Sequence, residues 1–125
     1  GSMQPGNMVT FTARMSGASE VPAVRTDGTG MVEASLNKDT QVLKWKLTYS
    51  GLSGPAAAAH FHGPAAAGSN AGVVVPFASA ASPIEGQATL TPAQVADLMA
   101  GKWYANLYTA ANKGGEIRGQ MMPGM

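Results

Sequence analysis

The sequence predicts an all-β fold: an antiparallel Greek-key sandwich or barrel of about eight strands, with one short helix near residues 92–100. Three observations support this prediction. Several stretches alternate apolar and polar residues with a period of two, as strands with one buried face do. Glycine, proline and asparagine separate these stretches, as turns require. The chain has 125 residues, of which 45% are hydrophobic, so its size and composition suit one domain.

The first half of the chain contains three alternating stretches. Residues 8–16 form the first, and a long connection leads from them to residues 31–36. Residues 41–50 give the clearest period of two in the chain, and the polar turn at 37–39 joins them to the preceding stretch. We therefore expect the second and third strands to form a hairpin.

The second half contains five shorter strands. Residues 58–62 carry the two histidines, 73–75 form a buried run of valine, and 84–90 alternate again. Residues 103–109 and 116–121 flank a glycine-rich turn and predict a terminal hairpin.

One helix is expected between these strands. Thr91 can cap the first turn, Pro92 takes the first helical position, and Gln94 completes a capping box. Gly101 then ends the helix. These residues predict a short surface helix.

The domain boundaries follow from these elements. We interpret residues 1–7 as the remnant of a cleaved expression tag and a disordered start, because the chain opens with Gly1-Ser2-Met3. Residues 8–122 form a single domain, and residues 123–125 form a tail.

Composition excludes several classes of site. The chain has no cysteine, which rules out disulfides, thiolate zinc sites, blue-copper sites and cysteine nucleophiles. Its net charge of +1, with scattered lysine and arginine, gives no basic patch for nucleic acid or an anionic membrane. No apolar run approaches the roughly 20 residues of a spanning helix. Nucleophilic triads and phosphate-binding glycine loops are also missing, so an enzymatic activity is not indicated.

The two histidines are the sharpest chemical feature. His60 and His62 alternate with Phe61 on one strand, so both imidazoles share one face about 6.6 Å apart along the strand. Two imidazoles on one face can bind one metal ion, although a solvated polar face explains the same pattern. If the terminal hairpin pairs beside this strand, alternation places further polar residues on the same outward face and predicts a shallow surface site. The outward residues are His60, His62, Tyr104, Asn106, Tyr108, Glu116, Arg118 and Gln120.

Several segments together resemble the CHRD domain family. They are AHFHGPA at 59–65, NAGVV at 70–74, LTPAQ at 90–94 and YANLYTAANKGGEIRGQ at 104–120. The resemblance covers nearly the whole chain in the right order. It implies a β-sandwich or barrel similar to that of copper–zinc superoxide dismutases, and an exported location, periplasmic or secreted.

The resemblance also identifies Tyr108 as the informative departure. Many family members have a third histidine at this position, in the pattern N-x-H-T. Tyr108 either abolishes a three-histidine site or supplies a phenolate oxygen in place of an imidazole nitrogen. The alternative for Tyr108 is a surface aromatic that packs beside Arg118 in a cation–π contact.

These residues together favour a mononuclear copper site. Nitrogen donors without thiolate favour Cu²⁺ over Zn²⁺ at equal availability, although zinc is compatible with the ligands. His60, His62 and Tyr108 are the expected ligands, and the neighbours that could orient them are Asn106, Glu116, Arg118 and Tyr104. The methionines at 121, 122 and 125 could assist copper capture, but plain packing and tail composition are the favoured explanation.

The leading functional prediction is a small exported copper-binding protein for copper handling or electron transfer, with a protein partner for copper exchange. The alternative is an extracellular adhesion or matrix-binding module without metal. A superoxide dismutase activity is less favoured, because a fold does not carry a function and the ligand set is too small for a paired centre.

Overall fold

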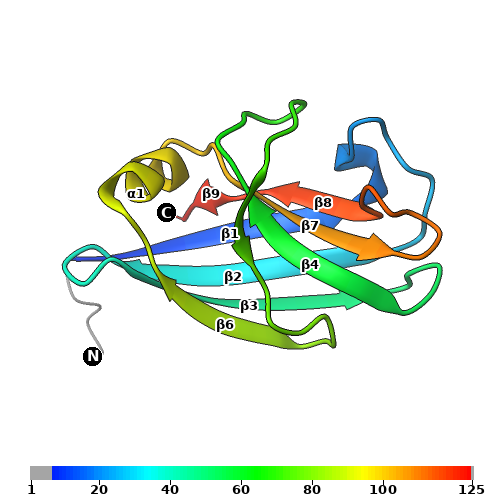
Figure 1. The fold of residues 1–125 in the computed structure, drawn as a ribbon, viewed down its shortest axis with the longest axis horizontal. Helices are drawn as coiled ribbons and strands as arrows, with labels where there is room; N and C mark the ends of the chain where they lie inside the picture. Colours follow the sequence, from blue (N-terminus) through cyan, green and yellow to red (C-terminus); the bar gives the residue numbers. More distant parts are fainter. Residues whose placement is uncertain (1–6, 125) are drawn as a thin grey trace.

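The strands join into one antiparallel sheet that curls into a nearly closed barrel (Figure 1). The computed structural model describes residues 7–124. The sheet contains β1 (Met8–Ser16), β2 (Thr29–Asn37), β3 (Val42–Ser50), β4 (Ala56–His62), β5 (Val73–Pro76), β6 (Ile84–Thr89), β7 (Tyr104–Thr109), β8 (Ile117–Gln120) and β9 (Met122–Pro123). Their order is β5-β4-β7-β8-β1-β2-β3-β6, with β9 paired to β1. The all-β prediction is confirmed.

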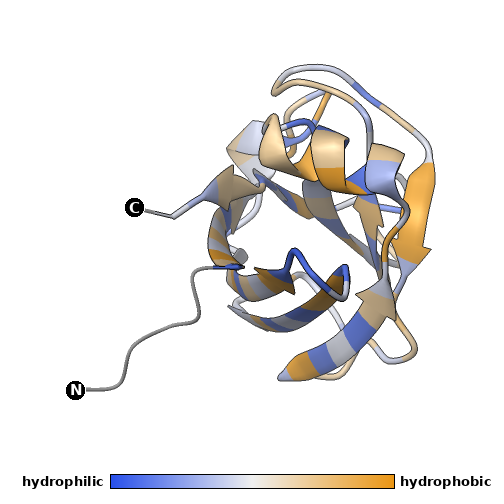
Figure 2. Ribbon diagram, turned by 90° about the vertical axis from the view of Figure 1, so that its left-hand side faces the viewer, coloured by the Kyte–Doolittle hydropathy of each residue, from blue (hydrophilic) through white to orange (hydrophobic). Residues whose placement is uncertain are grey.

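The β1–β2–β3 meander follows directly from the alternation in the sequence. Its register aligns Phe11 with Ala34 and Ala34 with Trp45, and all three side chains are buried. Figure 2 shows the resulting bands of hydrophobic and hydrophilic residues along the strands. The side chains of the hydrophobic residues point into the barrel, because each strand has one buried face.

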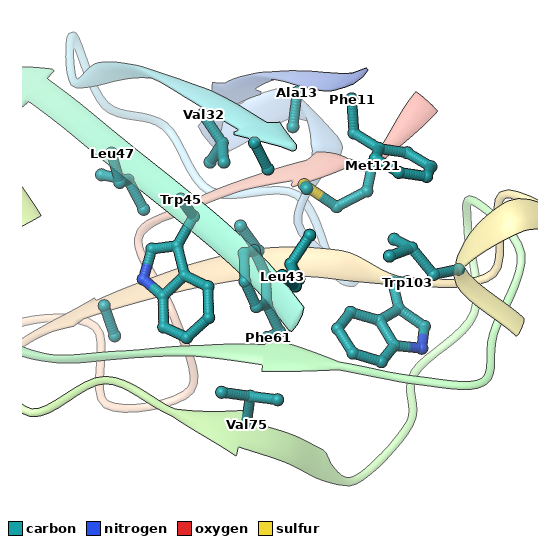
Figure 3. Close-up of a cluster of buried hydrophobic side chains, with 14 of the residues drawn as sticks. Phe11, Ala13, Val32, Leu43, Trp45, Leu47, Phe61, Val75, Trp103 and Met121 are labelled. Carbon is teal, nitrogen blue, oxygen red and sulfur yellow. The ribbon is translucent and has the colours of Figure 1, made fainter. Parts of the chain in front are cut away.

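The barrel interior is filled by aromatic and aliphatic side chains (Figure 3). Phe61 lies at its centre, with its ring 5.2 Å from that of Trp45 and 5.7 Å from that of Trp103. Phe61 is fully buried and comes from the same strand as the two histidines. The position of Phe61 in the core therefore fixes which way His60 and His62 point.

The predicted helix is α1 (Pro92–Met99), which lies at one end of the barrel (Figure 1). The Thr91 side chain accepts from Gln94 N–H and the Gln94 side chain accepts from Thr91 N–H, so the predicted capping box is confirmed. Leu98 is the fully buried residue of this helix. None of the helices in residues 7–124 has the length and apolarity that a membrane crossing demands.

The chain ends differ in part from the prediction. Residues 1–6, interpreted as tag remnant and disordered start, lie outside the described residues. Asn7 is described, and its carbonyl accepts a hydrogen bond from Lys38 N–H at 2.9 Å. Pro123, expected in a tail, belongs to β9, and Gly124 N–H donates to Thr10 C=O. The sheet therefore extends past residue 122.

The terminal hairpin does pair beside the histidine strand. β7 lies between β4 and β8, with His60 opposite Asn106, His62 opposite Tyr104, and Asn106 opposite Arg118. This register confirms the adjacency on which the outward polar group depends. Two loops, the 17–28 loop and the 63–72 loop, rise beside these strands in Figure 1. The 17–28 loop contains the short helix η1 (Gly17–Ser19), which packs against β8.

Candidate metal centre on the β4–β7–β8 face

Three side chains predicted as ligands come together on the outer face of β4 and β7. The ring centroids lie 5.7 Å apart for His60 and His62, 5.0 Å for His60 and Tyr108, and 6.1 Å for His62 and Tyr108. His60 and His62 share a face because they alternate with buried Phe61, and Tyr108 reaches them from the neighbouring strand. Three rings arranged in a triangle of this size can direct donor atoms at one point between them.

His62 is oriented by hydrogen bonds on both ring nitrogens. Its Nδ1 lies 2.9 Å from the Ala71 carbonyl oxygen, so Nδ1 carries the proton and donates. Nε2 is then the lone-pair nitrogen and accepts from the Tyr108 hydroxyl. A histidine held by a backbone carbonyl on one nitrogen and presenting the other is the usual arrangement of a metal ligand.

His60 contributes an unpartnered buried nitrogen. Its Nδ1 is buried and has no hydrogen-bond partner within the described residues. An orphaned ring nitrogen is unusual in a folded protein, since buried polar atoms are normally satisfied. A bound metal would give this nitrogen a partner, so the donor set and its surroundings fit a metal ion.

The pKa values of these groups suit neutral ligands. Burial lowers the pKa of His60 below its ordinary value. Burial also lowers the pKa of His62, and the charges of His60 and Arg118 add to this effect against the opposing Ala71 hydrogen bond. Both rings are therefore neutral at pH 7 and have free lone pairs. Burial raises the pKa of Tyr108 to about 12, so its phenol keeps its proton until a cation displaces it.

The site is more enclosed than the sequence indicated. We expected a shallow surface patch, but His62, Tyr104, Asn106 and Arg118 are all buried. The reason is that the 63–72 and 17–28 loops fold over this face, and they meet where Asn70 Nδ2 donates to the Val21 carbonyl. His60 and Tyr108 remain half-buried and give the site its contact with solvent.

Arg118 holds the 63–72 loop over the site. Its guanidinium donates to the Asn70 side-chain oxygen at 2.7 Å and to the Ser69 carbonyl. It also lies 3.5 Å from the centroid of the Tyr104 ring. The cation–π contact of Arg118 therefore forms with Tyr104 and not with Tyr108, although both tyrosines lie two residues from Asn106, the residue opposite Arg118.

Tyr104 connects this arginine to the histidine. Its ring stacks parallel on His62 with centroids 4.8 Å apart. Its hydroxyl donates to the Ala71 carbonyl at 3.1 Å and accepts from Ala71 N–H at 2.9 Å. Tyr104 thus supports His62 directly and also positions the carbonyl that fixes the His62 tautomer.

Glu116 does not orient the histidines, and the expectation that it lies on their face was wrong. Its carboxylate accepts hydrogen bonds from Thr26, Ser53, Thr109 and Asn112. Leu107 faces two residues of the neighbouring segment: its carbonyl accepts from Glu116 N–H, and Ile117 is its partner in the register. The alternation of side chains is therefore broken at the start of β8. Glu116 consequently points to the side of Thr109, away from Tyr108.

Asn106 lies beside Tyr108, and a hydrogen bond from the Asn106 side chain offsets part of the rise that burial causes in the pKa of Tyr108. The other remaining residues contact loops or the core. Asn106 Nδ2 donates to the Gly114 carbonyl, and Gln120 donates to the carbonyls of Ala65 and Gly101. Met121 is fully buried in the core and Met122 is exposed, while residue 125 lies outside the described residues. Burial removes Met121 from any copper-capturing group.

Sequence reasoning missed two contributors to this face, the Ala71 carbonyl and Glu20. Ala71 acts through its backbone, so its residue type gave no signal. Glu20 lies in the long connection after β1, where the sequence has no regular alternation from which the direction of a side chain could be predicted. Only the folding of both loops over β7 and β8 brings them to the site.

The fold and the site define an all-β barrel with a loop-covered cluster of two histidines and a tyrosine. Residues 11–121 match the CHRD domain family, and the chain belongs to this family. No curated protein and no solved structure matches the chain significantly. The likeness to copper–zinc superoxide dismutases that the resemblance implied stays a prediction.

Proposed function

We propose that the protein binds a single Cu²⁺ ion through His60, His62 and Tyr108. The observation that carries this proposal is that each histidine has a ring nitrogen available to bind a metal ion. His62 is fixed with its proton on Nδ1, and His60 has a buried nitrogen without a partner. Zn²⁺ can use the same nitrogen donors but has lower affinity for them at equal availability.

Tyr108 decides the strength of the site. In residues 7–124, no three histidine, cysteine or acidic side chains come together, so the oxygen of Tyr108 is the third donor beside the two rings. Its pKa of about 12 means that ligation as phenolate releases one proton at neutral pH. Copper affinity should then rise about tenfold per pH unit between about pH 7 and pH 9. Neutral histidines add no proton competition in this range.

The test is a Cu²⁺ titration of the purified protein, followed by optical and electron paramagnetic resonance spectra. We expect one equivalent to bind, with nitrogen hyperfine structure from two imidazoles and a phenolate charge-transfer band. His60→Ala and His62→Ala should each lower the affinity at least about tenfold. Retention of the same spectrum and affinity in both variants would contradict the proposal.

Two variants of Tyr108 separate its role from that of the histidines. Tyr108→Phe should remove the charge-transfer band and the pH dependence of the affinity, while the imidazole signals stay. Tyr108→His replaces the phenol with a third neutral imidazole and should bind copper at neutral pH without releasing a proton. If Tyr108→Phe keeps the parent spectrum, the phenolate is not a ligand.

A role in copper handling or electron transfer, an exported location and a protein partner for copper exchange are parts of the same proposal. The half-buried His60 and Tyr108 support the exchange role, because an incoming ligand could reach the site from their side. Weak, nonstoichiometric uptake of copper would instead favour a binding module without metal.

A further inference from the structure

Glu20 is a buried acid that the candidate metal centre does not use. It follows η1, and its backbone N–H donates to the Gly17 carbonyl at 3.1 Å. The side chain is 7% exposed, and its Oε2 is buried without a hydrogen-bond partner. A carboxylate in such a place is costly unless it is paired, which favours the neutral acid.

Asn106 presents a second unpartnered oxygen at the same place. Its Nδ2 is engaged with the Gly114 carbonyl, while its Oδ1 is buried without a donor. Both side chains approach Gly115, which has a φ of 120°: a Cβ there would lie 2.3 Å from Asn106 Oδ1 and 2.6 Å from Glu20 Oε2. Two acceptors that converge on one point are satisfied together when one of them carries a proton.

Two charged or titratable groups act on Glu20 from the strands beneath it. Arg118 comes from β8 and Tyr108 from β7. Burial raises the pKa of Glu20 to about 7, and the charge of Arg118 offsets this rise only in part. Arg118 is already committed to Ser69, Asn70 and the Tyr104 ring. The arginine therefore does not neutralise Glu20 in this arrangement.

We propose that Glu20 is a neutral acid that donates its proton to Asn106 Oδ1, and that its ionisation draws Arg118 away from the 63–72 loop. A carboxylate facing the amide oxygen is repelled by it, and Arg118 is the cation that acts on this carboxylate. Each hydrogen bond that Arg118 gives to Glu20 is one fewer for Ser69 or Asn70. The loop that orients His62 through Ala71 is then released as Glu20 ionises with rising pH.

The test uses the metal-free protein, so it stands independently of copper binding. Difference infrared spectra should show the C=O band of a protonated carboxylic acid that titrates near pH 7 and is missing from Glu20→Gln. Pairing with Arg118 in the open form should return the pKa of Glu20 toward its ordinary value of 4.5. Hydrogen exchange of Ala71 N–H should therefore exceed its intrinsic pH dependence by up to about tenfold per pH unit between pH 4.5 and about 7, and this excess should level off above pH 7. Glu20→Gln, which keeps a neutral side chain, should remove this excess.

Glu33→Gln is the matched control, because it removes one negative charge from an exposed position on β2. It should behave like the unaltered protein in both measurements. Absence of the acid band at pH 6, or the same excess exchange in Glu20→Gln, would overturn the proposal. If Glu20→Gln does not fold, carbon NMR of the Glu20 carboxyl group in the unaltered protein decides: a midpoint near the ordinary value of 4.5 overturns the proposal, and one near 7 supports it.

Discussion

The barrel has two polar outer faces that differ in what covers them. On the β1–β2–β3 face, Thr12, Glu33 and Lys46 lie opposite one another in register, and all three are exposed. On the β4–β7–β8 face, Tyr104 and Arg118 occupy equivalent outward positions, yet each is only 2% exposed. Both faces obey the same alternation.

The difference shows that alternation assigns a side chain to a face but does not determine its exposure. Cross-strand charges on the bare face, such as Glu33 beside Lys46, are solvated and contribute about 0–1 kcal/mol. On the covered face, each polar group must find a partner in a loop or another strand. Substitutions should therefore have large effects under the loops and small effects on the bare face.

Glu116→Gln should give the largest effect, because Glu116 anchors the end of the 17–28 loop through Thr26. Replacing a buried carboxylate that accepts several hydrogen bonds should lower the free energy of unfolding by about 3–4 kcal/mol in urea denaturation at pH 7. Glu33→Gln should change it by less than about 0.5 kcal/mol. Equal effects of the two variants would contradict the role of Glu116 in anchoring the 17–28 loop.

The same carboxylate predicts a dependence of stability on pH. Burial alone would raise the pKa of Glu116, but hydrogen bonds from Ser53, Thr26 and Thr109 outweigh it and lower the pKa to about 2. The folded state then binds fewer protons than the unfolded state between pH 4.5 and 2, so stability falls as the pH falls through this window. Urea denaturation across the window should show a shallower loss in Glu116→Gln than in the unaltered protein.

Arg118→Met should have the next largest effect. It removes the hydrogen bonds to Ser69 and Asn70 and the contact with Tyr104, and should lower the free energy of unfolding by about 2–3 kcal/mol. Hydrogen exchange should also show loss of protection at Ala71 N–H. Lys46→Met on the bare face is the control, with an expected change below about 0.5 kcal/mol. An Arg118→Met protein as stable as this control would contradict the role of Arg118 in holding the loop.

Tyr108→Phe should have the smallest effect of the three on the metal-free protein. It leaves His62 Nε2 without its donor, and the half-buried position lets water replace part of the bond. We expect a loss of about 1 kcal/mol in the free energy of unfolding at pH 7. A loss as large as that of Arg118→Met would show that the phenol is structural and more deeply involved in packing than its exposure indicates.

Local pattern predicted most of the fold. Strands with one buried face, such as β1 and β3, were found from their alternation, and α1 was found from Thr91, Pro92 and Gln94, because these signals reside in neighbouring residues. Alternation predicted that His60, His62 and Tyr108 share one face, and the family resemblance singled out Tyr108 as the third ligand. Glu116 was placed on the wrong face because the register is irregular at the start of β8. The burial of this face under the 17–28 and 63–72 loops was not predicted, because the sequences of these loops have no regular alternation of apolar and polar residues.

The register of β4, β7 and β8 has a consequence for the order in which the site can form during synthesis. His60 and His62 are made nearly fifty residues before Tyr108, and Arg118, which fastens the loop beside them, is made later still. Until residues 104–120 have left the ribosome, the two imidazoles have neither the Tyr108 hydroxyl beside them nor the 63–72 loop fastened over them. The cluster of two histidines and a tyrosine is therefore assembled last, and under the proposed function a metal ion would bind only after the barrel is complete.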